Sequence, residues 1–174
     1  MHMTSDAPHR HLERWVREFE LARPKYLTLE EAAVADLEMI LRDQNLRGQI
    51  HDIRHRVKEL ASFREKIERK NYVDPLREMR DLVGIRIVCL YPSVLVDVDK
   101  AVRSAFEVIR YEDKSKGGSP ELWRYSSIHY DCQIPAGHSG PRYDAIKGIA
   151  FEVQVRTILQ DAWAVVEHRL GYKN

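Results

Sequence analysis

The chain has 174 residues, of which 44% are hydrophobic and 32% charged, a balance typical of a protein that folds around its own core. Its formal net charge of +1 gives no overall attraction to nucleic acid or membrane, so an anion site has to come from local clustering of cations. No apolar run of ~18 residues and no signal-peptide pattern occurs, and both cysteines lie in apolar stretches, as in a reducing compartment. We therefore predict a single cytoplasmic domain, residues 1–174, without a membrane segment.

The N-terminal part of the chain is predicted to be helical. Residues 1–9 are expected to be loose, and residues 10–48 to form two amphipathic helices, at Leu12–Leu21 and Leu29–Leu46. Pro24 is expected to separate the two, because proline lacks the N–H that a helix interior needs. Thr28 is the expected N-cap of the second helix, and Gly48 its expected end.

Residues 50–173 form the predicted core of the domain, in which strand and helix patterns follow one another. The helix patterns are Leu60–Lys70, Pro75–Met79 and a segment that ends near Ser104. The strand patterns are Ile50–Lys58, Leu82–Leu90, Phe106–Tyr111, Trp123–Ile134 and Ala150–Arg156. Because not every crossover is helical, the sheet cannot be wholly parallel. We predict an α/β (α+β) fold, with a mixed β-sheet of about five strands flanked by helices.

The last strand carries the clearest signal of a site. Apolar residues alternate there with Glu152, Gln154 and Arg156, and the strand runs directly into a helix with Thr157 as its expected N-cap. A strand face with an acid, an amide and a guanidinium is typical of the floor of a polar site. A solvated edge strand has the same alternation, so this segment alone leaves both interpretations open.

Cations gather at the end of the first predicted strand. Arg56 and Lys58 alternate on one face, and Ser62 and Lys66 lie one turn apart on the helix that follows. Cations that converge on a helix N-terminus suit a phosphate group, although a solvated basic face would contain the same residues.

Two acids are candidates for a magnesium site. Asp81 precedes the apolar strand Leu82–Leu90 and Glu152 lies in the last strand, so adjacent strands would bring them close. Paired carboxylates are the usual protein ligands of Mg²⁺, with nucleotide phosphates and water completing the coordination. Arg86, inside the apolar strand, needs either a buried acidic partner or a planar base to stack on.

A third group falls on one face of the predicted strand Trp123–Ile134 and consists of Tyr125, Ser127 and His129. An aromatic ring, a hydroxyl and an imidazole together suit stacking on a base and holding a phosphate. A strand of mixed polarity without a ligand is the alternative.

Four motifs in this order resemble the synthetase domain of the RelA/SpoT family, and most of all the stand-alone small alarmone synthetases. They are RVKELASFREKIERK, RDLVGIRIV, YSSIH and FEVQVRTILQDAWAVVEHRLGYK, and the resemblance covers about Ile53–Lys173. It implies a nucleotidyltransferase-like fold. It also implies a Mg²⁺-dependent enzyme that transfers the pyrophosphate of ATP to the 3′-hydroxyl of GDP or GTP, with (p)ppGpp and AMP as products.

The resemblance further implies a role for each candidate residue. Asp81 and Glu152 would bind Mg²⁺, and Glu152 would also help to deprotonate the 3′-hydroxyl. The residues that would bind ATP are Arg56, Lys58, Ser62, Lys66 and Arg86, with the adenine between the two arginines. The residues that would bind the acceptor nucleotide are Tyr125, His129, Gln154 and Asp161. Among these, the tyrosine would stack on the base, the histidine would reach the phosphates and the glutamine would lie by the ribose. The aspartate would accept hydrogen bonds from a guanine edge.

One departure from the family pattern keeps other acceptors open. The family usually has K-P-N-G-Y at the stacking tyrosine, whereas this chain has PELWRY at 120–125. Some relatives are toxins of toxin–antitoxin systems that pyrophosphorylate the 3′ end of tRNA or adenine nucleotides, and such a protein would have tRNA and an antitoxin as partners. The nearly neutral loop at 112–121 disfavours tRNA. A catalytically inactive nucleotide-binding regulatory module is the alternative from another class, and the oligomeric state is left open.

Overall fold

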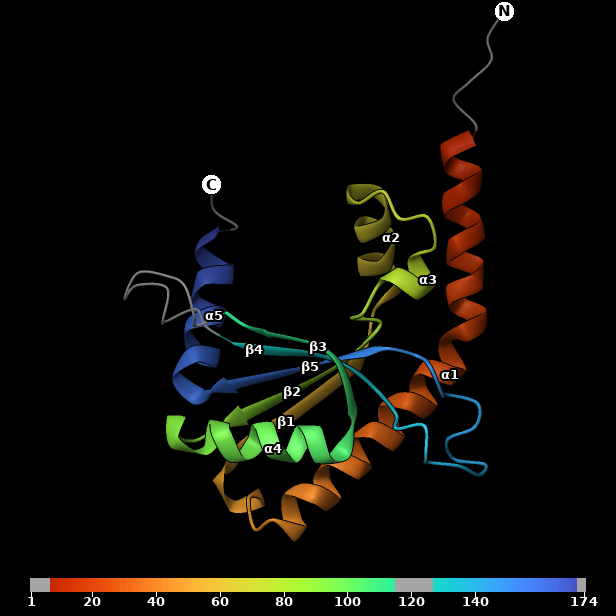
Figure 1. Cartoon of the computed structure of the whole chain (residues 1–174). Coiled ribbons are helices and arrows are strands. Elements are labelled where there is room, and N and C mark those ends of the chain that lie inside the picture. The colour runs from red at the N-terminus through yellow and green to blue at the C-terminus, as the bar shows by residue number, and fades with distance from the viewer. Residues whose placement is uncertain (1–6, 115–126, 172–174) are drawn as a thin grey trace, which may run out of the picture.

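The protein is built around one mixed sheet of five strands, in the order β1-β2-β5-β4-β3. The structure, a computed structural model, describes residues 7–114 and 127–171 (Figure 1). The strands are β1 (Ile50–Val57), β2 (Val83–Cys89), β3 (Glu107–Asp113), β4 (Ile128–Gln133) and β5 (Phe151–Thr157). Strands β2 and β5 are parallel, and the other neighbouring pairs are antiparallel. The predicted mixed sheet is thereby confirmed.

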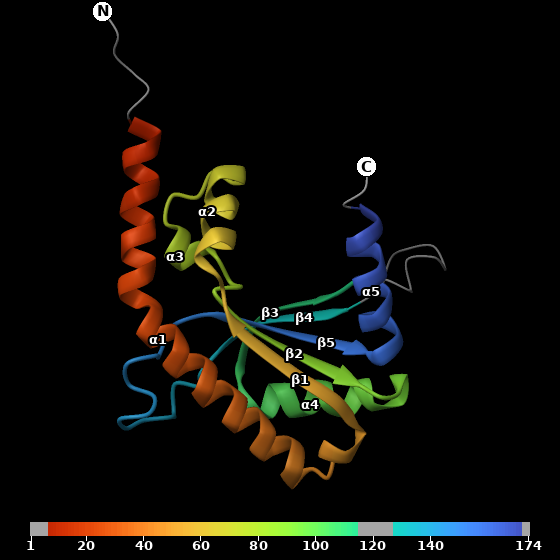
Figure 2. The same ribbon diagram turned by 180° about the vertical axis from the view of Figure 1, so that it is seen from behind.

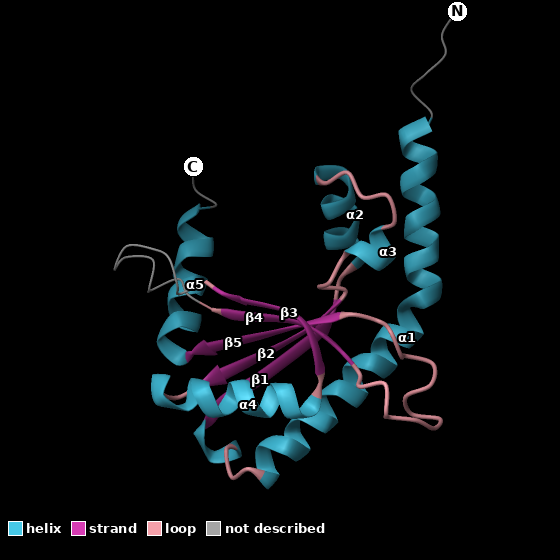
Figure 3. Ribbon diagram, in the orientation of Figure 1, coloured by secondary structure: helices cyan, strands magenta, loops and turns pink. Residues whose placement is uncertain are grey.

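The helices are α1 (Ala7–Asp43), α2 (Leu60–Arg69), α3 (Pro75–Glu78), α4 (Leu95–Ala105) and α5 (Ile158–Gly171), with 3₁₀ turns at Arg47–Gln49 and Pro92–Val94. Helix α4 and the C-terminal half of α1 lie against one face of the sheet, whereas α2, α3 and α5 stand on the side of the other face (Figures 2 and 3). None of the helices in the described part of the chain has both the length and the apolar composition needed to cross a membrane.

The core lies between the sheet and helices α1 and α4. The apolar residues of β5, Phe151, Val153 and Val155, are at most 1% exposed on this face. Their polar neighbours in the strand are partly exposed on the opposite face, as the period of two predicts. The sheet therefore has an apolar face for stability and a polar face on which a site can form.

The N-terminal segment differs from the prediction, because one helix replaces the expected two. Helix α1 begins at Ala7, so residues 7–9 are helical, and it continues through Pro24. Thr28 is consequently not an N-cap; its hydroxyl donates to the carbonyl of Pro24 within the helix, at 3.0 Å. The helix bends between its two halves (Figure 2), as expected where proline removes one backbone hydrogen bond. Apolar residues on both sides of Pro24 join the same core, which keeps the helix continuous.

Helix α1 also ends earlier than predicted, through asparagine rather than glycine. Asn45 has a positive φ of 56°, its N–H donates to Arg42 O at 2.9 Å, and the next N–H, of Leu46, donates to Leu41 O at 2.8 Å. These two bonds form a Schellman motif, in which asparagine is the usual substitute for glycine. Gly48 instead belongs to the 3₁₀ turn that leads into β1.

The elements around the site match the prediction more closely. Thr157 caps α5 as expected, because its hydroxyl accepts from the N–H of Gln160 at 3.3 Å while Gln160 Oε1 accepts from the N–H of Thr157 at 2.8 Å, a capping box. Strand β3 extends to Asp113, two residues beyond the expected end. Strand β4 begins at Ile128, and the first part of the predicted strand Trp123–Ile134 lies outside the described residues.

Candidate active site

The polar face of the sheet carries two rows of side chains that run across the strands. In the first row the register pairs Arg54 with Arg86, Arg86 with Gln154, and Gln154 with His129. The second row lies two residues along each strand and consists of Arg56, Gly84, Glu152, Asp131 and Arg110. Because strand side chains alternate between faces, both rows project from the same face.

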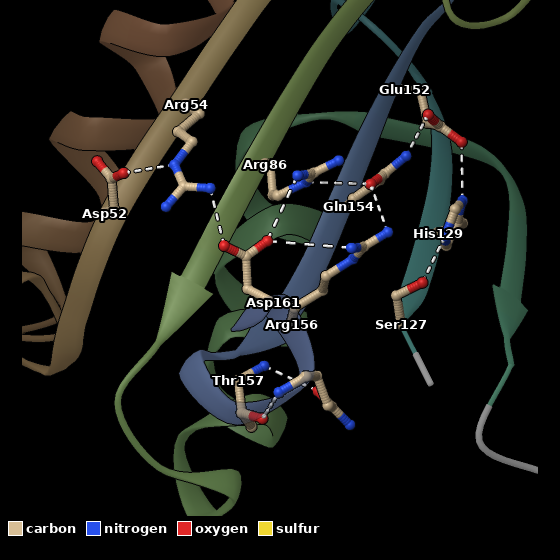
Figure 4. A network of polar contacts seen from close by, with 11 residues as sticks. Asp52, Arg54, Arg86, Ser127, His129, Glu152, Gln154, Arg156, Thr157 and Asp161 are labelled. Carbon is tan, nitrogen blue, oxygen red and sulfur yellow. Dashed lines mark hydrogen bonds and ion pairs between the residues drawn. The ribbon is translucent and has the colours of Figure 1, made fainter. Parts of the chain in front are cut away.

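Glu152 is held from two sides within this face (Figure 4). The ring nitrogen Nδ1 of His129 lies 2.8 Å from Glu152 Oε1, and Gln154 Nε2 donates to Glu152 Oε2 at 2.7 Å. Burial raises the pKa of the Glu152 carboxyl, but the hydrogen bonds from His129 and Gln154 outweigh burial, so the pKa lies below its ordinary value. Glu152 is therefore an ionised acceptor at neutral pH.

A second carboxylate, Asp161 in the first turn of α5, draws arginines together below the first row (Figure 4). Its Oδ2 accepts from Arg54 Nη1 at 2.8 Å, and its Oδ1 accepts from Arg86 Nη1 at 3.4 Å. Arg156 Nη1 lies 3.9 Å from the same Oδ1, and Asp161 is only 5% exposed. Arg86 also donates to Gln154 Oε1 at 3.3 Å. Asp161 is the buried acidic partner that this arginine, inside an apolar strand, was expected to need.

Asp81, at the entrance to β2, holds two lysines. Its Oδ2 accepts from Lys58 Nζ at 2.8 Å and from Lys66 Nζ at 2.7 Å. Burial raises the pKa of the Asp81 carboxyl, but these two charged donors lower it by more, so the net pKa lies below the ordinary value. Two members of the predicted cationic group, Lys58 and Lys66, thus meet at the predicted metal ligand, which offsets part of their charge.

Two pockets open on this polar face and share Asp81 and Glu152 in their lining. The first, of about 260 Å³ and here called the arginine pocket, is lined by Arg54, His55, Arg56, Asp81, Gly84, Ile85, Arg86, Glu152 and Gln154. The second, of about 380 Å³, is here called the mixed-charge pocket. Its lining includes His129, Asp131 and five cations in or next to α2, β2 and β3: Lys66, Lys70, Arg80, Arg110 and Lys114. The two candidate metal ligands therefore lie where the pockets meet.

The structure brings most of the predicted site residues together, with two exceptions. Ser62 is exposed on α2, one turn before Lys66, and its hydroxyl makes no hydrogen bond within the described part of the chain. Tyr125 lies outside the described residues. The other predicted residues line the two pockets or contact residues that do.

Arg54 was missed in the sequence analysis, although it lies two residues before Arg56 and the period of two offered a signal for it. Arg156 was expected on the floor of a polar site, but without a specific partner. Ser127 was grouped with His129 in a set suited to a base and a phosphate. Its hydroxyl lies 2.6 Å from His129 Nε2 and it is 4% exposed, a pairing that needs the three-dimensional positions.

The paired carboxylates fit a divalent cation. Asp81 Oδ1 is buried without a hydrogen-bond partner in the described part of the chain, which leaves an oxygen available to a ligand. Within residues 7–114 and 127–171, no group of three or more His, Cys, Asp or Glu side chains is placed to hold a metal alone. A cation held by Asp81 and Glu152 would therefore need substrate phosphates and water to complete its coordination, which is the usual arrangement for Mg²⁺.

Comparison with known proteins agrees with this geometry. Residues 55–174 match the family described as "Region found in RelA / SpoT proteins". GTP pyrophosphokinase YwaC of Bacillus subtilis (strain 168) is 28% identical over 150 residues, which are 82% of this chain and 70% of YwaC. GTP pyrophosphokinase YjbM of the same organism is 33% identical over 132 residues, which are 68% of this chain but about half (54%) of YjbM.

Solved structures resemble this fold as well. Small alarmone synthetase 1 from Bacillus subtilis has a TM-score of 0.71 at 26% identity, and the match covers 90% of this chain and 80% of that one. A second structure of that synthetase, bound to its product pppGpp, has a TM-score of 0.66 at 23% identity, with 93% and 83% covered, which supports the fold alone. Because the family match spans well over half of the sequence, the chain belongs to the RelA/SpoT family.

Proposed function

We propose that this protein is a Mg²⁺-dependent pyrophosphokinase that transfers the β,γ-pyrophosphate of ATP to the 3′-hydroxyl of GDP or GTP, with (p)ppGpp and AMP as products. The observation that carries this proposal is the pair of pockets that meet at Asp81 and Glu152. Transfer between two nucleotides requires both to be held in line about one charged centre. YwaC and YjbM are named GTP pyrophosphokinases, which supports the same reaction.

The arginine pocket suits ATP. Arg56 and Arg86 project from neighbouring strands on one face, and Gly84 lies opposite Arg56 with open space where a Cβ would be. Planar guanidiniums stack well on a planar base. Lys58 and Lys66 both donate to Asp81 beside this pocket. Lys58 lies two residues before α2, whose N-terminus has no side-chain cap, and Lys66 lies in the last turn of that helix. Free N–H groups at a helix N-terminus, together with the two lysines, suit the ATP phosphates, with Ser62 in the first turn.

In the proposed reaction, Glu152 accepts the proton of the acceptor's 3′-hydroxyl while the 3′-oxygen bonds to the β-phosphorus of ATP. The bond between that phosphorus and the α,β-bridging oxygen breaks, and AMP leaves with the bridging oxygen. Mg²⁺ bound by Asp81 and Glu152 would neutralise charge on the phosphates. Lys58 and Lys66 hold the phosphate that leaves with AMP and the pyrophosphoryl group that is transferred. Arg86 and Arg56 fix the adenosine end, so that the reacting atoms meet at the shared boundary of the pockets.

Replacing Asp81 by asparagine is expected to separate nucleotide binding from turnover. The substitution removes the charge that neutralises Lys58 and Lys66, so a non-hydrolysable ATP analogue should bind at least as tightly without metal. The enhancement of binding by Mg²⁺ should be lost and kcat should fall about 100-fold or more. Calorimetric titration with and without Mg²⁺ measures the first effect, and pyrophosphate transfer the second.

The matched control for this change is Asp144→Asn, which alters an exposed carboxylate paired with Lys147 outside both pockets. Its binding and turnover should equal those of the wild type. An Asp81→Asn variant that keeps the full enhancement by Mg²⁺ would show that Asp81 is not a metal ligand.

The mixed-charge pocket is the proposed acceptor site. Its cations suit the phosphates of a nucleotide, and Glu152 lies at its boundary with the arginine pocket. Stacking by Tyr125 and base recognition by Asp161 stay predictions. Both oxygens of Asp161 accept from guanidiniums and the residue is only 5% exposed, so a guanine edge could reach it only if Arg54 or Arg86 moved. The family comparisons do not favour tRNA, adenine nucleotides or an inactive module as alternatives.

A pyrophosphate-transfer assay tests the proposed function. The protein is incubated with Mg²⁺ and γ-labelled ATP, and GDP, GTP, ADP and bulk tRNA are offered separately. Label in a guanine nucleotide together with released AMP is the expected result. Label only in tRNA or ADP would keep the chemistry and change the acceptor, whereas no transfer to any of the four would contradict the proposal. Partner proteins and the cytoplasmic location stay predictions.

A further inference from the structure

We infer that His129 is a positioning residue for Glu152: it holds the carboxylate through Nδ1, while Ser127 holds the ring through Nε2. The reaction in which this arrangement serves rests on the proposed function above, whereas the arrangement itself can be tested on the resting protein. It gives His129 a role different from the phosphate contact that the family resemblance implies.

The hydrogen-bond chemistry fixes the direction of the chain Ser127–His129–Glu152 (Figure 4). A carboxylate can only accept, so the 2.8 Å contact between His129 Nδ1 and Glu152 Oε1 requires the proton on Nδ1. In the neutral ring Nε2 is then an acceptor, and the Ser127 hydroxyl, 2.6 Å away, is able to donate to it. Both ring nitrogens are thus engaged inside the protein.

Ser127 is a suitable anchor because its own position is fixed. It immediately precedes β4 and is 4% exposed, and its carbonyl accepts from the N–H of Lys114 at the end of β3, at 3.2 Å. The His129 side chain is 14% exposed, between this anchor and the strand that carries Glu152. Ser127 and His129 therefore form a rigid arm that reaches from β4 to β5.

Gln154 holds the other oxygen of the Glu152 carboxylate. Gln154 Nε2 donates to Glu152 Oε2 at 2.7 Å, so each carboxylate oxygen has one donor from the protein. A carboxylate oxygen accepts about two hydrogen bonds, which leaves one site on each for a substrate hydroxyl or a cation. Fixing a reacting group in one orientation is a large source of rate enhancement, and it is the contribution that we assign to His129.

Substituting His129 by asparagine or by glutamine tests its two ring nitrogens separately. The Asn amide can replace the Nδ1–H donor, whereas the Gln amide reaches about as far as Nε2. With the proposed arrangement, His129→Asn should keep kcat within about tenfold of the wild type, and His129→Gln should lower it about 100-fold, the usual range for a partner that orients a ligand or catalytic group. KM for GDP should be unchanged in both. Ser127→Ala should lower kcat by a smaller factor, and His51→Asn, at an exposed position in β1, is the matched control.

The opposite pattern would overturn the inference. If His129 contacts an acceptor phosphate through Nε2, His129→Gln keeps more activity than His129→Asn and KM for GDP rises. Equal loss in both variants, with folding intact by thermal melting, also overturns it, because the position would then require imidazole chemistry rather than a donor at Nδ1.

The tautomer of His129 provides a test that does not depend on turnover. Long-range ¹H–¹⁵N spectra of the labelled protein, assigned by the signal that is lost in His129→Asn, should show the proton on Nδ1. A neutral ring with its proton on Nε2 alone would overturn the inference even in an active enzyme. If no acceptor receives label but Nδ1 carries the proton, the proposed function fails and the arrangement stands.

Discussion

Replacing Glu152 by glutamine is expected to lower kcat about 1,000-fold or more while the protein stays folded. The side chain keeps its length, but it loses both its charge and its ability to accept a proton. It also meets two donors, His129 Nδ1 and Gln154 Nε2, with one acceptor oxygen, so one of these hydrogen bonds is lost. That loss should cost about 1 kcal/mol of unfolding free energy. Pyrophosphate transfer and thermal melting measure the two effects on the same sample.

Glu107→Gln is the matched control, because it makes the same chemical change at an exposed position of β3 outside both pockets. It should have the kcat and melting temperature of the wild type. A Glu152→Gln variant with more than a tenth of wild-type activity would remove Glu152 from the proposed roles of metal ligand and proton acceptor. Loss of folding in that variant would leave Asp81→Asn as the test of the same charged centre.

The strand that forms the floor of the site was predictable because its signal is local. The alternation in β5 assigns Glu152, Gln154 and Arg156 to one face without any knowledge of the neighbouring strands. Thr157 and Gln160 form a capping box within four residues, so the change from strand to helix also depends on residues close together in the sequence. Local periodicity and capping therefore predicted both the floor and the helix that brings Asp161 to the arginines.

Helix α1 shows where a local rule is outweighed. Pro24 is a strong helix breaker by itself, but Phe19 on one side and Leu29 on the other are both fully buried in one cluster. Each fully buried side chain of this size contributes about 1.5–3 kcal/mol, so the two together match or exceed the roughly 3 kcal/mol penalty of an interior proline. The bend in α1 reconciles the two demands, and the balance depends on tertiary contacts that a linear pattern does not contain.

The partners within the site could not be predicted either, because they depend on register between strands far apart in sequence. Arg54 and Arg86 face each other across β1 and β2, and they meet Asp161, which is more than seventy residues away from both, only after β5 and α5 are in place. The sequence identified Arg86 as needing either a buried acid or a planar base. The structure supplies the acid and still leaves the guanidinium, with 34% of its side chain exposed, in the lining of the arginine pocket.

Asp161→Asn is expected to be the most destabilising of the single changes considered, and it separates two roles for this residue. The aspartate is 5% exposed and balances Arg54, Arg86 and the half-buried Arg156, whose pKa is lowered by burial and by the neighbouring charge of Arg86. Removing one partner of a buried charge pair costs about 3–5 kcal/mol; because Arg54 is half exposed, we expect about 2–3 kcal/mol here. Chemical denaturation measures this loss directly.

Two controls make the result specific. Asp97→Asn breaks an exposed pair with Lys100 and should cost no more than about 0.5 kcal/mol. In an Arg54→Met background the Asp161→Asn change should cost less than in the wild type, because part of the uncompensated charge has already been removed. If the costs in the two backgrounds are equal, Arg54 and Asp161 are not coupled and the ion pair contributes nothing measurable.

The kinetics of Asp161→Asn then distinguish an anchor for arginines from a reader of the acceptor base. As an anchor, Asp161 fixes Arg86 beside the proposed adenine site, so its loss raises KM for ATP and leaves KM for GDP unchanged. As a reader of guanine, it would raise KM for GDP and relax the preference over ADP, with little effect on ATP. The contacts at 2.8 Å to Arg54 and 3.4 Å to Arg86 favour the first outcome, because they engage a carboxylate that is only 5% exposed and so give a base little access to it.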